Sequence, residues 1–138
     1  MSDEGTRPER SAAQGATLIV EGRGKLLIGL RAILEPGQTV AFGRSRSCPL
    51  SLRRSPAFAA AKDPVAMLAS TEFNRISRIH FEITHQRDGR VLVRDRSNNG
   101  TWVRGTRVDG AVTVTLDARP LEIAPVEGDL GSLVVRRG

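Results

Sequence analysis

The sequence predicts an all-β protein, folded as an antiparallel β-sandwich or β-barrel. Three observations support this fold class: short apolar segments recur along the chain, turn signals separate them, and no long apolar stripe at helical spacing competes with them. The alternation is clearest where Phe81 and Ile83 alternate with Glu82 and Thr84, as expected of a strand with one buried face.

The expected strands lie in two groups. In the first group they span residues 17–20, 26–34, 39–42 and 50–52. In the second group they span residues 79–84, 91–93, 102–103, 112–116, 121–123 and 133–135. Between the strands lie dipeptides typical of tight turns, namely Glu21-Gly22, Pro36-Gly37, Asp88-Gly89, Asn99-Gly100 and Asp109-Gly110.

Residues 55–72 interrupt this succession of strands. They are rich in alanine and contain the pair Asp63-Pro64. Because Asp is favoured at a helix N-cap and Pro at the first helical position, a short helix is expected over Val65–Ser70. The segment is too small to form a core of its own, so we interpret it as an insertion between two strands.

The chain of 138 residues suggests a single domain. Residues 1–16 show no apolar periodicity and are expected to be a flexible tail, which leaves 17–138 as the domain. No apolar run approaches the roughly 20 residues that span a bilayer, and the N-terminus lacks the apolar stretch of a signal peptide. A cytoplasmic protein without a membrane partner is expected.

Few residues are available for metal or catalytic chemistry. With one cysteine, Cys48, and two histidines, His80 and His85, neither an internal disulfide nor a zinc cluster is expected. No nucleophile-elbow motif surrounds a serine, and no glycine-rich phosphate loop ends in lysine. The sequence therefore predicts a protein that is not an enzyme and needs no cofactor.

The positive charge is concentrated in one part of the chain. The formal net charge is +6, and residues 40–110 hold 13 basic and 6 acidic side chains, a local excess of seven. Such an excess suits either a docking face for an anionic group or a nucleic-acid surface. Nucleic acid is the weaker alternative, because aromatic residues for base stacking are scarce: four Phe, one Trp and no Tyr.

Three clusters contain the candidate site residues. They are Phe42-Gly43-Arg44, Ser77-Arg78-Ile79-His80 and the stretch from Asp95 to Val103, which includes Asn98-Asn99-Gly100-Thr101. Taken singly, the first is explained by a strand end, the second by a turn cap with a structural histidine, and the third by a hairpin turn.

Taken together and in this order, the clusters resemble the signature of forkhead-associated (FHA) domains. The characteristic positions are Gly43, Arg44, Ser77, His80 and Asn99, and the resemblance covers roughly residues 17 to 136. It implies a twisted β-sandwich of about eleven mostly antiparallel strands. Its loops at one end would bind a peptide that contains phosphothreonine.

The resemblance also assigns roles to single residues. Arg44 would hold the phosphate, Ser77 would donate its hydroxyl to it, and Arg78 would add a second positive charge. Asn98 would lie beside the phosphate, and Asn99 would bind the peptide main chain. These roles suit a phosphate, which carries about −1.5 to −2 charges and three acceptor oxygens.

The remaining motif residues, Gly43, His80, Gly100 and Thr101, would have structural roles. One departure from the family pattern lies nearby: where family members often have Val-Asn-Gly, this sequence has Val103-Arg104-Gly105. The arginine would alter a turn or add charge near the site.

The sequence thus predicts a module that binds phosphothreonine peptides and recruits a threonine-phosphorylated protein, either a Ser/Thr kinase or its substrate. Two alternatives remain: a basic β-domain that binds nucleic acid, and a scaffold that binds its partner without phosphate. The presence of Arg44, Ser77 and Asn99 together argues against the scaffold, which would need none of these residues.

Overall fold

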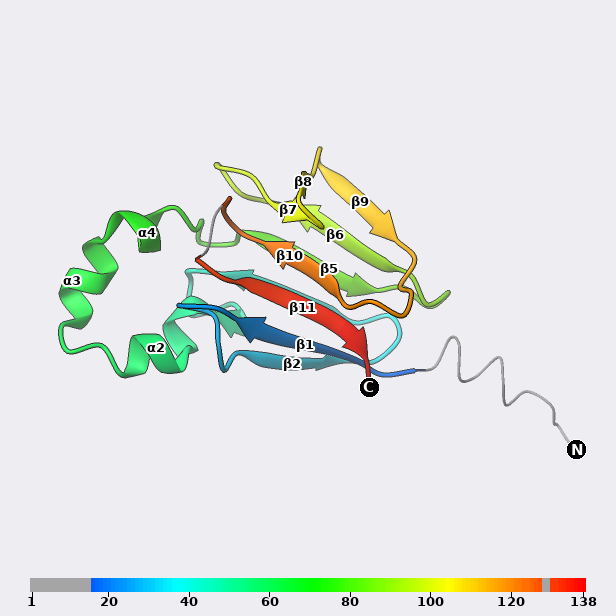
Figure 1. Cartoon of the computed structure of the whole chain (residues 1–138), viewed down its shortest axis with the longest axis horizontal. Helices are drawn as coiled ribbons and strands as arrows, with labels where there is room; N and C mark the ends of the chain where they lie inside the picture. The colour runs from blue at the N-terminus through cyan, green and yellow to red at the C-terminus, as the bar shows by residue number, and fades with distance from the viewer. Residues whose placement is uncertain (1–15, 128–129) are drawn as a thin grey trace, which may run out of the picture.

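The computed structural model describes residues 16–127 and 130–138, and in them two β-sheets pack face to face (Figure 1). The first sheet has the strand order β2-β1-β11-β10-β7-β8, and the second has the order β4-β3-β5-β6-β9. The strands are β1 (Leu18–Arg23), β2 (Arg31–Leu34), β3 (Thr39–Gly43), β4 (Leu50–Ser51), β5 (Phe81–His85), β6 (Val91–Asp95), β7 (Trp102–Val103), β8 (Thr106–Arg107), β9 (Ala111–Val114), β10 (Leu121–Ala124) and β11 (Ser132–Arg137). All described pairings are antiparallel except that of β3 with β4, so the predicted fold class is confirmed.

The core lies between the two sheets and follows the predicted alternation. In β5, Phe81 and Ile83 are buried while Glu82 and Thr84 are partly exposed. Ile83 pairs across the sheet with Val93, which is also fully buried. β1, in the other sheet, also alternates buried and less buried residues. Burial of the apolar surface between the sheets is the main force that holds them together.

The strand expected over residues 26–34 is wrong in its first half. Residues 24–29 form a turn, and only Arg31–Leu34 is a strand. Gly24 and Gly29 have φ values of 92° and 94°, a conformation that L residues with side chains rarely adopt. The apolar run suggested a strand because Leu27 is buried, but Leu27 reaches the core from a turn.

The segment between β4 and β5 is helical. It comprises η1 (Leu52–Arg54), α2 (Pro56–Ala59), α3 (Pro64–Ala69) and α4 (Thr71–Asn74). The helix expected over Val65–Ser70 is present as α3, with Pro64 in its first turn and Asp63 accepting a hydrogen bond from the Ala66 N–H at 3.1 Å. Helix α3 therefore begins as predicted, with Asp63 at the N-cap and Pro64 in the first turn.

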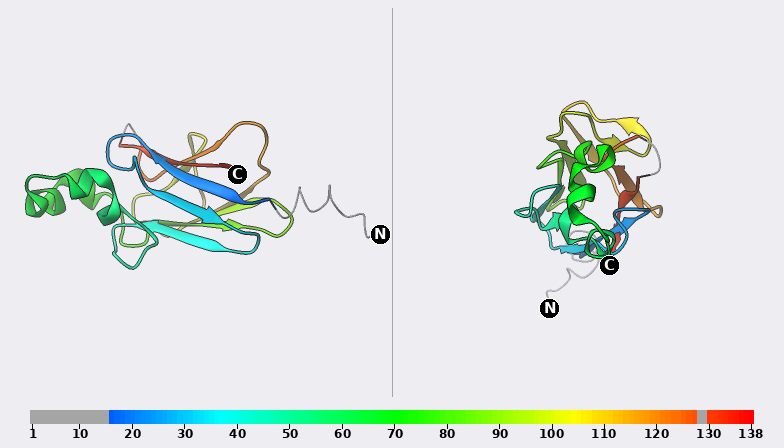
Figure 2. Two further views of the ribbon diagram at one scale, coloured as in Figure 1. Left: turned by 90° about the horizontal axis from the view of Figure 1, so that it is seen from below. Right: turned by 90° about the vertical axis from the view of Figure 1, so that its left-hand side faces the viewer.

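Phe73, on α4, attaches the helical segment to the core between the two sheets. Phe73 is buried, and its ring lies 5.8 Å from that of Phe58 on α2. Ser55 and Ser70 cap α2 and α4 by accepting hydrogen bonds from the N–H groups of Phe58 and Phe73, each at 3.1 Å. Figure 2 shows that the helices cover one end of the sandwich.

Two further expectations concern the ends and surroundings of the domain. The tail predicted over residues 1–16 lies, apart from Ala16, outside the described residues. In the part of the chain that the structure describes, no helix is long and apolar enough to cross a membrane.

The turn between β7 and β8 gives a first testable prediction. Arg104 and Gly105 both have positive φ, 50° and 82°, and Arg104 is the only such non-glycine residue described. Asn tolerates this conformation better than other L residues. We therefore expect the free energy of unfolding of Arg104→Asn to be about 0.5–1 kcal/mol higher than that of Arg104→Ala. Urea unfolding of both variants measures the difference.

The comparison of these two variants is matched. Both variants lose the ion pair between Arg104 Nη2 and Asp117 Oδ1, which lie 3.5 Å apart. Such an exposed ion pair contributes little to stability. Any difference between Asn and Ala therefore reports the backbone conformation. Equal stability of the two variants would show that the turn relaxes to a negative φ.

Candidate functional site

The three sequence clusters meet at the end of the sandwich that carries the helices (Figure 1). The pairing of strands brings them there. Phe42 at the end of β3 is opposite Phe81 at the start of β5, and Phe81 is opposite Asp95 at the end of β6. Because these neighbouring strands are antiparallel, the loops after β3, before β5 and after β6 lie side by side.

Gly43 allows the first two loops to touch. A Cβ atom at this position would lie 2.2 Å from the carbonyl oxygen of Arg78, so no other residue fits without a shift of the backbone. Beyond Gly43, the N–H groups of Arg44 and Ser45 donate to the carbonyls of Ser77 and Arg78 at 2.9 and 3.0 Å. The contact fixes the position from which Arg44 extends.

His80 joins the second loop to the third. Its ring is buried, Nδ1 accepts a hydrogen bond from the Ser77 N–H at 2.9 Å, and Nε2 lies 2.8 Å from the Gly100 carbonyl oxygen. A backbone N–H can only donate, so Nδ1 carries no proton and Nε2–H donates to Gly100. Burial lowers the pKa of His80 below 6.5, although the Gly100 carbonyl and nearby Asp95 act in the opposite direction.

The third loop is held in shape by Asp95. Its Oδ1 accepts hydrogen bonds from the N–H and hydroxyl of Ser97 at 3.0 and 2.6 Å and from the hydroxyl of buried Thr101 at 2.8 Å. Ser97 Oγ in turn accepts from the Gly100 N–H at 2.7 Å. Partial burial alone would raise the pKa of Asp95, but these hydrogen bonds outweigh burial and lower it.

Asp95 and Ser97 were not among the expected site residues, although the sequence contained a signal for them. An Asp followed two residues later by Ser is typical of a turn in which the carboxylate accepts the backbone N–H. In the same loop, Gly100 has a φ of 109° and Thr101 is fully buried.

A hollow of about 370 Å³ opens between the three loops, and we call it the main hollow. All five residues expected to bind a phosphopeptide line it: Arg44, Ser77, Arg78, Asn98 and Asn99. Three further residues line it that sequence reasoning missed: Asn74, Ile79 and Arg96. No carboxylate belongs to its described lining.

Main-chain contacts hold the polar residues of the main hollow. Arg44 Nε donates to the Ile76 carbonyl at 2.9 Å, and Asn99 Nδ2 donates to the Arg75 carbonyl at 3.1 Å. Ser77 Oγ accepts from the Asn98 N–H at 3.1 Å. Because that bond uses a lone pair of the hydroxyl, its hydrogen can still donate to a ligand.

The missed residues are placed by the fold. Arg96 Nη1 lies 3.3 Å from Glu82 Oε1, which balances part of its charge. Asn74, on α4, donates through Nδ2 to the carbonyls of Leu68 and Ser70 at 2.9 and 2.8 Å. The helical segment thus contributes Asn74 to the lining of the main hollow, which no motif in the sequence indicated.

Comparison with known proteins identifies the family of the chain. A sequence profile described as "FHA domain" matches residues 40–119, and the chain therefore belongs to the FHA family, whose members bind phosphothreonine peptides. No curated protein sequence matches the chain closely enough to be informative.

Solved structures of FHA domains share the fold. The FHA domain of CT664 from Chlamydia trachomatis is 19% identical, with a TM-score of 0.61 over 87% of this chain and 96% of that one. The N-terminal FHA domain of Rad53p from S. cerevisiae, in complex with a phosphothreonine peptide, is 23% identical, with a TM-score of 0.52 over 87% and 94%. The FhaA FHA domain, complexed with the intracellular domain of Rv3910, is 18% identical, with a TM-score of 0.52 over 86% and 99%.

Proposed function

We propose that this chain is a non-catalytic module that binds phosphothreonine peptides. In this way it recruits a protein phosphorylated by a Ser/Thr kinase, either the kinase itself or its substrate. The observation that carries the proposal is the convergence of Arg44, Ser77 and Asn99, from three separate loops, on one hollow without a described carboxylate. Membership of the FHA family supports it.

The phosphate would bind between Arg44 and Ser77. The Nη atoms of Arg44 make no hydrogen bond with a described residue, so its guanidinium can offer a two-pronged contact to phosphate oxygens. The Ser77 hydroxyl adds a short donor, and Arg78 adds a second positive charge. Asn98 also lines the main hollow, and its side-chain amide could donate to a third oxygen.

Asn99 would fix the register of the peptide. Its Nδ2 is tied to the Arg75 carbonyl, which holds the amide plane in place. Its Oδ1 makes no hydrogen bond with a described residue and can accept an N–H from the peptide backbone. A contact to the backbone requires no particular side chain, so the phosphate and the neighbouring surface would select the sequence.

Fluorescence polarisation against a degenerate phosphothreonine peptide pool tests the proposal. We expect saturable binding that disappears when the pool is dephosphorylated. A phosphoserine pool, expected to bind more weakly, tests whether the site recognises the threonine methyl group, for which Ile79 is the apolar residue of the lining. Failure of all phosphorylated pools to bind would reject the proposal.

A salt titration with duplex DNA and phosphatase treatment of the bound partner separate the two alternatives. Non-specific binding to duplex DNA falls by orders of magnitude between about 50 and about 200 mM salt and does not depend on a phosphopeptide. A scaffold that ignores phosphate would bind its partner equally well before and after phosphatase treatment. Binding that requires phosphothreonine excludes both explanations of the site.

A further inference from the structure

A second hollow, of about 240 Å³, adjoins the main hollow, and the proposed function does not use it. Its described lining has four arginines and one serine: Arg44, Ser45, Arg46, Arg53 and Arg78. Arg44 and Arg78 also line the main hollow, so the two hollows share a wall. We call this site the arginine hollow.

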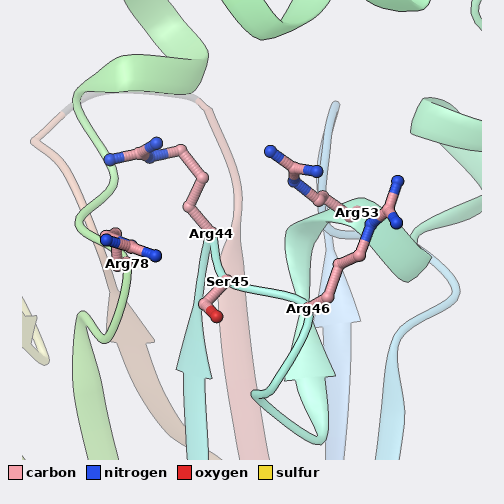
Figure 3. Close-up of a pocket in the computed structure, with 5 residues that line it drawn as sticks. All are labelled: Arg44, Ser45, Arg46, Arg53 and Arg78. Carbon is pink, nitrogen blue, oxygen red and sulfur yellow. The ribbon is translucent and has the colours of Figure 1, made fainter.

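Local structure places the arginines around the arginine hollow. A turn in which the Cys48 N–H donates to the Ser45 carbonyl at 3.1 Å presents Arg46. Arg53 lies in η1, which begins where Ser51 Oγ accepts the Arg53 N–H at 3.1 Å. Figure 3 shows Arg44 and Arg78 on one side, and Arg46 and Arg53 on the other.

The charge of the arginine hollow is not balanced within the described residues. Among the described residues, none of its four guanidinium groups forms an ion pair with a carboxylate, and no acidic residue lines the hollow. Elsewhere in the described chain, five arginines do have a carboxylate partner: Arg90, Arg96, Arg104, Arg119 and Arg136. Four neighbouring cations without counter-charge repel one another, and an anion between them would remove that repulsion.

Arg53 provides a second, independent observation. Its Nε atom is buried and has no hydrogen-bond partner among the described residues. A buried donor without a partner is costly and calls for an explanation. Burial leaves the positive charge of this guanidinium poorly solvated. An anion bound by its Nη atoms would compensate that charge.

We propose that the arginine hollow binds a second phosphoryl group on the same peptide, so that the module prefers doubly phosphorylated partners. The proposal rests on the proposed function, because the shared residues Arg44 and Arg78 would contact both phosphates. A phosphoryl group suits four guanidiniums better than a carboxylate does, since it has more charge and three acceptor oxygens. Because an extended chain advances about 3.3–3.6 Å per residue, two sites that share Arg44 and Arg78 correspond to phosphates only a few residues apart.

The experiment uses the intact chain and one phosphothreonine peptide taken from the pool assay. In a series of peptides, one further position is varied, from four residues before the phosphothreonine to four residues after it. At each position the residue is Thr, phosphothreonine or Glu. We expect the second phosphate to lower the Kd by about tenfold or more at one or two positions, and Glu to lower it much less.

Variants connect that gain to the arginine hollow. Arg53→Gln and Arg46→Gln should each remove most of the gain while leaving the Kd of the singly phosphorylated peptide within about twofold, because neither residue lines the main hollow. Arg119→Gln is the matched control. Arg119 lies in the loop after Val114, which pairs with Val91 at the far end of β6 from the site.

Four results would overturn this inference while the proposed function stands. They are no gain at any position, an equal gain at every position, a gain that survives both arginine variants, or an equal gain from Glu. An equal gain everywhere would reflect only long-range attraction between the peptide and a basic protein. If the singly phosphorylated peptide does not bind at all, the proposed function itself fails, and this inference fails with it.

Discussion

Arg44→Ala is expected to weaken binding of a phosphothreonine peptide by about 100-fold or more, because a charge-assisted, two-pronged contact to the phosphate is lost. The fold should survive the change. Arg44 makes one described side-chain hydrogen bond, from Nε to the Ile76 carbonyl, and its guanidinium lies at a surface hollow. Fluorescence polarisation measures the affinity, and thermal unfolding confirms that the variant is folded.

Two controls make the result on Arg44 specific. Arg44→Lys keeps the charge but not the planar fork, so its affinity should lie between those of wild type and Arg44→Ala. Arg119→Ala removes the same side chain at the opposite end of the sandwich and should bind like wild type. Binding by Arg44→Ala within about threefold of wild type would place the phosphate elsewhere.

His80→Gln should lower the free energy of unfolding by about 2–3 kcal/mol at pH 7.5, because one amide cannot replace both ring contacts in a buried site. The wild-type protein should also lose stability as the pH falls below about 6.5. In that range the unfolded chain takes up a proton on His80, whereas the folded chain, with its lowered pKa, does not. Urea unfolding between pH 5 and 8 measures both effects.

The variant should lack this part of the pH dependence, since glutamine does not titrate. Asp95 does not mask the pH dependence due to His80. Its lowered pKa contributes stability above pH 3.8, and this contribution is lost only at more acidic pH. Parallel pH profiles for wild type and His80→Gln would show that His80 is not the titrating group. An unchanged free energy of unfolding would contradict its role in joining the loops.

Sequence reasoning predicted those parts of the fold and site that local patterns determine. Alternation predicted β5, the Asp63-Pro64 pair predicted α3, and the three clusters predicted residues that strand pairing does bring to one hollow. The strand expected over residues 26–34 is wrong in its first half, because apolar content alone does not distinguish a strand from a turn that buries one leucine.

The other missed features depend on distant parts of the chain. Asn74 reaches the main hollow only because α4 ends beside the loop before β5. In the sequence, nothing distinguishes Arg46 and Arg53 from the other arginines. Only the turn at Ser45 and the helix η1 bring them near Arg44. Such neighbourhoods follow from packing between segments, for which one sequence carries no local signal.

The contacts of His80 have a consequence for the thermodynamics of binding. Its ring bonds to Ser77 and Gly100, and its backbone N–H and carbonyl bond to Phe42 and Arg96, so one residue connects all three loops. The loops are thus already ordered before a ligand arrives. A peptide that binds there would lose its own conformational freedom but would not have to order the protein, so more of its contact energy would remain as affinity.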